Sequence, residues 1–300
     1  MKLPITAIIL TLNEEKNLSE CIASIKEHVN QIVIVDSFST DSTQKIAEQN
    51  NADFIQNKWV NYSQQFQWGL DNANITSEWV LRIDADERWT EEGFSLLSNE
   101  LSKNDINGVF VKIKIFFMDR WISHGTIYPN YFLRIFRKSK GKIEQRWMDE
   151  HIQVEGNTVH TEIDIIEYNH DRQADIGGWT DKHNSYAIRE AIEHILLKEE
   201  SNTIDGIADR QGGKTAKKRW FKEEVYGNAP LLWRAFLYFG YRYIFKLGFL
   251  DGKEGFIFHF LQGFWYRFLV DVKIIEIQKK LTKTGMPLKD LLLKEYKITI

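Results

Sequence analysis

Residues 78–88 read EWVLRIDADER, an apolar run that ends in two carboxylates. The first half alternates and is largely apolar, which predicts a β-strand. Asp84 and Asp86 then stand two residues apart, where the apolar run stops. On an extended backbone such side chains point the same way, so we expect them to present two hard oxygen ligands to one divalent cation. The alternative interpretation is a polar turn with two solvated acids.

The residues before this stretch predict a mostly parallel open sheet with helices on its faces. Strand patterns cover residues 5–12, 31–36, 52–55 and 78–84, and helical patterns lie between them. In such sheets ligands bind at the carboxyl ends of the strands. Polar residues fall at these ends, namely Thr11, Asn13, Asp36 and Asp84–Asp86. Their convergence on one edge favours a functional Asp-x-Asp.

The loop after the first strand carries further signals. We expect Asn13 to cap the following helix, with Glu14 and Glu15 in its first turn. No Gly-x-Gly-x-x-Gly follows the strand, which argues against a dinucleotide-binding dehydrogenase.

Composition narrows the class of protein. The chain has 300 residues, of which 43% are apolar, enough for a packed core. A net charge of −3 argues against nucleic-acid binding, and the single cysteine, Cys21, excludes a disulfide framework and fits a reducing compartment. No signal-type segment and no run of about 18 apolar residues is present, so we expect a cytoplasmic protein.

The middle of the chain predicts more strands around polar and aromatic groups. Strand patterns cover 108–117, 133–137 and 162–167, and an aromatic loop spans 121–131. Aromatic faces suit a sugar ring and the arginines of 133–137 suit phosphate, although a wet aromatic sheet edge fits equally. An acid cluster follows at 146–151, and a helix is expected over 179–197.

The C-terminal part differs in composition. We expect a first domain over 1–200, a polar linker over 201–216 and a helical region over 217–300. Between 217 and 253, eight basic residues face three acidic ones.

Basic and aromatic residues recur every fourth position in this region, at Arg234, Tyr238, Arg242 and Lys246. This spacing predicts a basic stripe, flanked by aromatics, along an interfacial helix on anionic lipid. A second helix over 256–270 is too polar to span a membrane. The alternatives are a helical hairpin packed on the first domain and a surface for homo-oligomers.

Three motifs resemble the nucleotide-sugar signatures of family 2 glycosyltransferases with the GT-A fold. They read TLNEE at 11–15, VDSFSTDST at 35–43 and DADE at 84–87. The block 124–137 is similar to lipopolysaccharide-core β-glucosyltransferases and their capsule and exopolysaccharide relatives. GFLDG at 248–252, followed by WYR at 265–267, resembles the C-terminal region of bacterial members. Phe38 departs from the pattern, since relatives usually carry Gly or another small residue there.

The resemblance implies a site. Nucleoside contacts would come from Thr11, Asn13 and Glu14, and Asp36 would accept from the uracil N–H. Asp84 would hold the ribose or a metal-bound water, and Asp86 would bind Mn²⁺ or Mg²⁺ directly. His170 is expected as a further metal ligand or as a structural histidine.

The resemblance also implies an inverting reaction, which needs a base for the acceptor hydroxyl. Glu150 is the expected base and Asp149 the second candidate, unless Glu150 forms a structural salt bridge with Arg146 or His151. A UDP-sugar would donate a hexose to a lipid-linked, lipopolysaccharide-core or capsule oligosaccharide at the inner face of the plasma membrane. The alternatives are a sugar nucleotidyltransferase and a non-catalytic membrane-associated scaffold with a degenerate nucleotide fold.

Overall fold

The computed structural model describes residues 2–103, 105–146, 150–171, 175–201 and 226–298. The chain forms two compact units, Met1–Trp179 with Lys246–Phe256, and Thr180–Phe245 with Ile257–Ile300. This division differs from the predicted one because residues 180–200 belong to the second unit and a short C-terminal segment belongs to the first. The predicted linker over 201–216 lies, from residue 202 on, outside the described residues.

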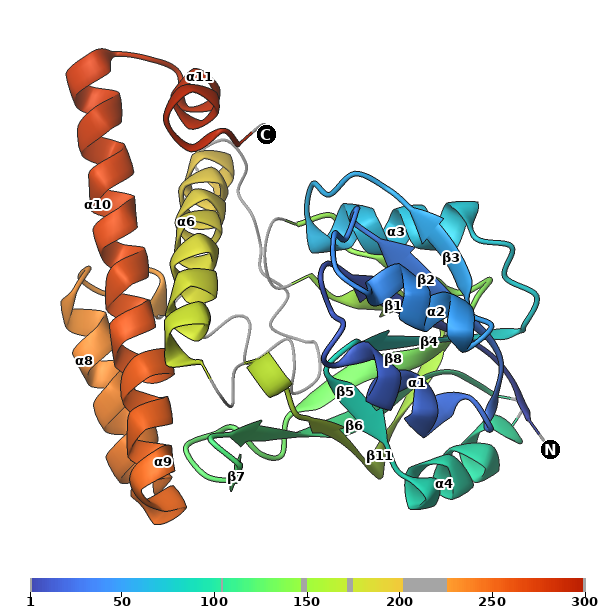
Figure 1. Ribbon diagram of the computed structural model, residues 1–300. Coiled ribbons are helices and arrows are strands. Elements are labelled where there is room, and N and C mark those ends of the chain that lie inside the picture. The colour runs from blue at the N-terminus through green and yellow to red at the C-terminus, as the bar shows by residue number, and fades with distance from the viewer. Residues whose placement is uncertain (1, 104, 147–149, 172–174, 202–225, 299–300) are drawn as a thin grey trace. The chain divides into compact units, whose positions relative to one another are not determined.

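The first unit is built on one sheet in the order β3-β2-β1-β4-β8-β6-β11-β5, with β7 paired to β6 (Figure 1). β1 pairs in parallel with β2 and β4, β2 with β3, and β6 with β11, whereas β8 runs antiparallel to β4 and β6. The strands are β1 Leu3–Thr11, β2 Val29–Asp36, β3 Asp53–Gln56, β4 Trp79–Asp84, β5 Glu87–Trp89, β6 Ile106–Phe117, β7 Arg120–Ile122, β8 Tyr131–Arg137 and β11 Asn157–Glu167. A separate hairpin pairs β9, Gly141–Ile143, with β10, Ile152–Val154. The predicted α/β fold and the predicted strands of residues 5–84 are confirmed.

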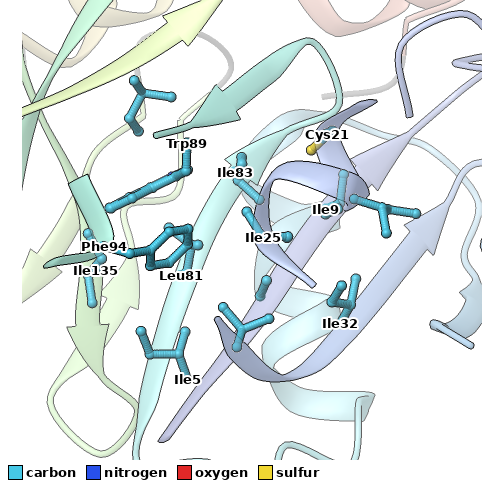
Figure 2. Close-up of a cluster of buried hydrophobic side chains, with 14 of the residues drawn as sticks. Ile5, Ile9, Cys21, Ile25, Ile32, Leu81, Ile83, Trp89, Phe94 and Ile135 are labelled. Atoms are coloured by element: carbon cyan, nitrogen blue, oxygen red, sulfur yellow. The ribbon is translucent and has the colours of Figure 1, made fainter. Parts of the chain in front are cut away.

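Apolar side chains cover both faces of the sheet. One cluster joins alternate residues of the strands, such as Ile9 and Leu81, to Cys21 and Ile25 of α1 and Phe94 of α4 (Figure 2). A second cluster on the other face joins the intervening strand residues to α3 and the β9–β10 hairpin. The helices are α1 Leu18–Ile25, α2 Thr43–Gln49, α3 Tyr62–Asn72 and α4 Glu91–Leu101. Burial on both sides leaves the strand ends as the place for polar chemistry.

Local signals explain where the helices begin. The Asn61 side chain accepts from the Gln64 N–H at the start of α3, and Thr90 accepts from the Gly93 N–H at the start of α4. α1 begins at Leu18 after Asn17, so the prediction that Asn13 caps this helix is wrong. Asn13 instead adopts a left-handed conformation, with φ of 54°, and its side chain bonds another loop.

The second unit is helical. It contains most of α6 (Ile176–Ser201), α8 (Trp233–Gly240) with a π-helical turn (Tyr241–Phe245), a π-helical turn (His259–Trp265) leading into α10 (Tyr266–Thr284), and α11 (Leu288–Leu291). α6 confirms the helix predicted over 179–197. α6, α10 and α11 share an apolar core that includes Ile192 and Ile274. Among the described residues, no helix is long and apolar enough to cross a membrane.

A buried ion pair closes the second unit. The guanidinium of Arg234 donates to Asp271 at 2.7 Å, and both side chains are almost fully inaccessible to solvent. Arg267 pairs with Glu190 of α6 in the same unit. Arg267 and Asp271, two polar residues in the region of the second predicted helix, therefore form ion pairs inside this unit.

Candidate functional site

The ends of β1 and β2 form one hydrogen-bonded loop system. Thr11 and Asp36 are paired in register, and the Thr11 hydroxyl donates to the Asp36 carboxylate at 2.9 Å. The main-chain N–H of Asn13 donates to the Ser39 hydroxyl, and the Asn13 side chain accepts from the N–H of Thr40, both at 2.8 Å. The convergence predicted for these strand ends is confirmed in this part of the sheet.

Asp36 is buried and accepts hydrogen bonds from residues of this loop system. Its side chain is 0% exposed, and its two oxygens accept from four groups: the hydroxyls of Thr11 and Ser39, the N–H of Ser39 and the amide of Gln56. A carboxylate offers about four acceptor positions, so this set is complete. The predicted contact between Asp36 and a uracil ring stays a prediction, and it would require one of these four hydrogen bonds to be exchanged for the uracil N–H.

Glu14 also belongs to the loop system. Its N–H donates to the Thr43 hydroxyl at 2.9 Å, and its carboxylate accepts from the Asn17 side chain. Both contacts connect the end of β1 to the helices that follow β1 and β2.

The Asp-x-Asp forms a turn between two strands. β4 ends at Asp84 and β5 begins at Glu87, so Ala85 and Asp86 reverse the chain. The expectation that both acids lie on one extended strand is wrong, because β5 must turn to pair antiparallel with the end of β11. Leu10 pairs with Asp84 just as Thr11 pairs with Asp36, so the two acids flank β1 at the same edge of the sheet.

Two arginines lie beside Asp84. Arg134 of β8 approaches its carboxylate at 3.3 Å, and Arg82 lies 3.9 Å from its other oxygen. Arg134 also pairs with the buried Glu87. Burial raises the pKa of Glu87 to about 8, against the opposing effect of the Arg134 charge. Arginine and carboxyl side chains therefore alternate where the Asp-x-Asp turn meets β8.

Asp86 is 9% exposed and accepts from the Asn169 side chain at 2.8 Å. Within the described part of the chain, no group of three or more His, Cys, Asp or Glu side chains is arranged to hold a metal ion. Asp84 and Asp86 supply the oxygen donors that Mg²⁺ and Mn²⁺ prefer, and such ions usually take their remaining ligands from water and substrate phosphates. The donor chemistry of these residues fits a divalent cation.

His170 follows β11 by three residues. Its main-chain N–H donates to Asn17, and its ring nitrogen lies 3.1 Å from the Glu20 carboxylate. The ring is about one-third exposed. These contacts fit a structural histidine, and metal ligation by His170 stays a prediction.

Glu150 lies beside Arg82, the residue two positions before Asp84. The guanidinium donates to the Glu150 carboxylate at 2.8 Å, and both side chains are about nine-tenths buried. The salt bridge considered for Glu150 thus exists with Arg82, whereas His151 lies 3.7 Å from Glu144. Asp149, the second candidate base, lies outside the described residues.

The aromatic loop over 121–131 packs on charged residues of β6 and β11. The Tyr128 hydroxyl donates to Asp164 at 2.9 Å, and Lys114 lies over the Trp121 ring. Trp121 and Tyr128 pack edge to face. The loop therefore presents aromatic and polar groups side by side, as predicted.

A C-terminal segment returns to the first unit beside this loop. The buried Asp251 accepts from His124 Nδ1 at 2.7 Å, from the His124 N–H at 2.9 Å and from the Ser123 hydroxyl at 3.0 Å. The Gly125 N–H donates to the Lys246 carbonyl at 2.9 Å. We call residues 246–256 the anchor segment. Burial acts to raise the pKa of Asp251, but the hydrogen bonds from His124 and Ser123 outweigh it and lower that pKa below its usual value.

The predicted basic stripe is wrong in its orientation. Arg234 and Arg242 are 3% and 1% exposed, because Arg234 pairs with Asp271 and Arg242 donates to Gln262. The exposed large side chains of the same helical stretch are apolar, namely Trp233, Phe236, Leu237, Tyr241, Ile244 and Phe245. We call these six residues the apolar face.

Several residues of the site were not singled out from the sequence. These residues are Glu87 and Asn169, which contact Arg134 and Asp86. The burial of Glu87 depends on the pairing of β5 with β11, although a glutamate directly after an Asp-x-Asp and two residues before a tryptophan was a usable signal.

Comparison with known proteins is consistent with this geometry. The sequence profile of the family described as "Glycosyl transferase family 2" matches residues 6–162. An uncharacterized glycosyltransferase of Rickettsia felis is 28% identical over 274 residues, which cover 85% of this chain and 86% of that protein. The lipopolysaccharide core biosynthesis glycosyltransferase LpsC of Rhizobium meliloti is 34% identical over 164 residues, which cover 52% of this chain and 59% of LpsC.

Among solved structures, glucosyl-3-phosphoglycerate synthase from Mycobacterium tuberculosis, in complex with Mn²⁺, uridine diphosphate and glucosyl-3-phosphoglycerate, is 21% identical. Its TM-score is 0.32, and the match covers 37% of this chain and 44% of that one.

Proposed function

The chain belongs to glycosyl transferase family 2, and on that premise we propose that it transfers a hexose from a UDP-sugar, with inversion, to a saccharide acceptor. The observation that carries the proposal is the register at the end of β1. Thr11 pairs with Asp36 on one side, and Leu10 pairs with Asp84 on the other. The loops that follow β1 and β2 and the Asp-x-Asp turn thus lie at one edge of the sheet. Asp36 and Asp84 are two strand spacings apart there, about 10 Å.

On this proposal the donor lies along that edge. Thr11, Asn13 and Glu14 belong to the loop that surrounds the nucleoside. Asp86, with Asp84, would hold Mn²⁺ or Mg²⁺, which neutralises the charge of the diphosphate leaving group when bound. Arg134 and Arg82, which now face Asp84, are suited to bind phosphate oxygens.

Glu150 would take the proton of the acceptor hydroxyl. Arg82 contacts both Glu150 and Asp84. This shared contact supports the role of Glu150 because it holds the proposed base close to the Asp-x-Asp turn. A fixed carboxylate on the acceptor side of the sugar is what inversion by direct displacement requires.

The acceptor is proposed to be a lipid-linked or lipopolysaccharide-core oligosaccharide, at the inner face of the plasma membrane. Similarity to LpsC supports the acceptor class. The apolar face supports a membrane location, since contiguous exposed apolar patches mark interaction surfaces.

Donor hydrolysis tests the reaction without an acceptor. A panel of UDP-sugars with Mn²⁺ or Mg²⁺ should show slow, metal-dependent release of UDP for one sugar. Calorimetry with UDP and Mn²⁺ should show binding that EDTA abolishes. A protein that neither hydrolyses any donor nor binds UDP with metal would be a scaffold, and the proposal would be rejected.

A further inference from the structure

Phe38 combines two unfavourable features at the end of β2. Its φ is +62°, in the left-handed region that favours glycine, and its side chain is 56% exposed. A bulky residue in this conformation persists only where its surroundings impose it, and such residues gather at functional sites. An exposed phenylalanine also gives up the stabilisation that burial would supply.

The surroundings of Phe38 impose its conformation from both sides. Before it, the Ser37 N–H donates to the Thr11 carbonyl at 2.9 Å. After it, the Ser39 N–H donates to Asp36 at 2.8 Å, and the Ser39 hydroxyl accepts from Asn13. The loop is therefore held by polar contacts that do not involve the phenyl ring.

More than half of the surface of Phe38 is exposed to solvent. Its ring makes no stacking contact with another ring and no contact with a cation in the described part of the chain. Leu12, at the end of the neighbouring strand β1, is likewise 50% exposed. Two large apolar side chains thus border the polar loop at the edge where Thr11 and Asp36 meet.

Given the proposed function, we infer that Phe38 stacks on the pyrimidine base of the donor nucleotide and sets donor affinity through that contact. A nucleobase is planar, with apolar faces and a polar edge, which matches an aromatic ring beside hydroxyl and amide groups. Asp36, two residues before Phe38, and Asp84 are two strand spacings apart, about 10 Å, which is comparable to the distance between the base and the diphosphate of a nucleotide. Asp36 is buried and hydrogen-bonded within the loop, so the exposed ring of Phe38 is the apolar plane that this loop offers to a base.

Three substitutions test the ring separately from the loop. Phe38→Gly removes the ring and relieves the left-handed strain, so this variant should unfold at the same or a higher urea concentration. Phe38→Leu keeps bulk without planarity, and Phe38→Tyr keeps the plane. Leu96→Ala, which trims a 38% exposed side chain on α4, is the matched control. Calorimetry measures the affinity of each variant for UDP and for inorganic diphosphate, each in the presence of Mn²⁺.

Loss of the stack should weaken UDP binding about 5- to 150-fold in Phe38→Gly and Phe38→Leu, the range measured for base–aromatic stacking. Phe38→Tyr and Leu96→Ala should bind UDP like the wild type, and diphosphate binding should be equal in all variants. Wild-type UDP affinity in Phe38→Gly would overturn the inference and leave the proposed function intact. Absence of metal-dependent UDP binding in the wild type would overturn both.

Discussion

Arg82 and Glu150 form an ion pair at 2.8 Å although 68 residues separate them in the chain. Arg82 stands two residues before Asp84 on β4, and Glu150 stands just before β10. The pair therefore joins the strand of the Asp-x-Asp turn to the segment that carries the proposed base. It also gives Glu150 both a catalytic and a structural interpretation, which different measurements separate.

Replacing Glu150 by Gln should leave UDP affinity unchanged and lower kcat by about 10²- to 10⁴-fold, the usual contribution of a general base. The amide still accepts from Arg82, so the melting temperature should change little. Glu155→Gln, at a glutamate whose side chain is 85% exposed, is the control. A normal kcat together with a lower melting temperature would assign Glu150 a structural role only.

Replacing Asp86 by Asn should abolish Mn²⁺- or Mg²⁺-dependent transfer, because a neutral amide is a poor ligand for these cations. The amide oxygen can still accept from Asn169, so the fold should be preserved. Metal titration of UDP binding measures the effect, with Asp71→Asn on α3 as the control. Transfer at the wild-type rate and metal concentration would exclude a ligand role for Asp86.

The His124–Asp251 contact should stabilise the first unit. Asp251→Asn should lower the free energy of unfolding by about 1–3 kcal/mol, since a buried carboxylate loses charge-assisted hydrogen bonds. A double-mutant cycle with His124→Ala, followed by urea denaturation, measures the coupling. Additive effects of the two substitutions would show that the contact contributes nothing.

The same contact predicts a pH dependence. The pKa of Asp251 is lower in the folded protein than the usual 3.8, so the carboxylate form is favoured by folding. Its contribution should be complete above about pH 4 and decline as the pH falls below that value. In Asp251→Asn, this part of the decrease in the free energy of unfolding at acidic pH should be absent. Urea denaturation of both proteins across the acidic pH range measures the difference. An unchanged decrease would assign it to other carboxyl groups.

The apolar face should bind lipid vesicles through insertion. Leu237→Ser with Phe245→Ser removes two side chains that are 70% and 77% exposed, and should weaken vesicle binding at least tenfold. Arg234 and Arg242 are buried, so vesicle binding should not depend on their charges. It should persist at about 0.5 M salt, an ionic strength that screens electrostatic attraction to anionic lipid. Val272→Ser with Leu293→Ser, on exposed positions of the second unit, is the control. Release by salt would indicate binding by other basic groups.

β1, β2 and β4 were predictable because each is a largely apolar run with a polar residue at its end. The Asp84–Asp86 turn was not, since its direction depends on β5 pairing with β11, almost eighty residues later. The orientation of the helix carrying Arg234 and Arg242 was also out of reach. Period-four spacing places both on one face, but Asp271 and Gln262, far along the chain, decide that this face is buried.

The anchor segment has an evolutionary consequence. Its contacts with the loop at 120–125 use the carbonyls of Lys246 and Leu250 and the carboxylate of Asp251. Recombination that exchanged about the last sixty residues with those of a relative would lose these contacts, unless the loop at 120–125 were exchanged as well. Hybrid chains that exchange this segment should therefore need two crossover regions, one before the loop at 120–125 and one before residue 246.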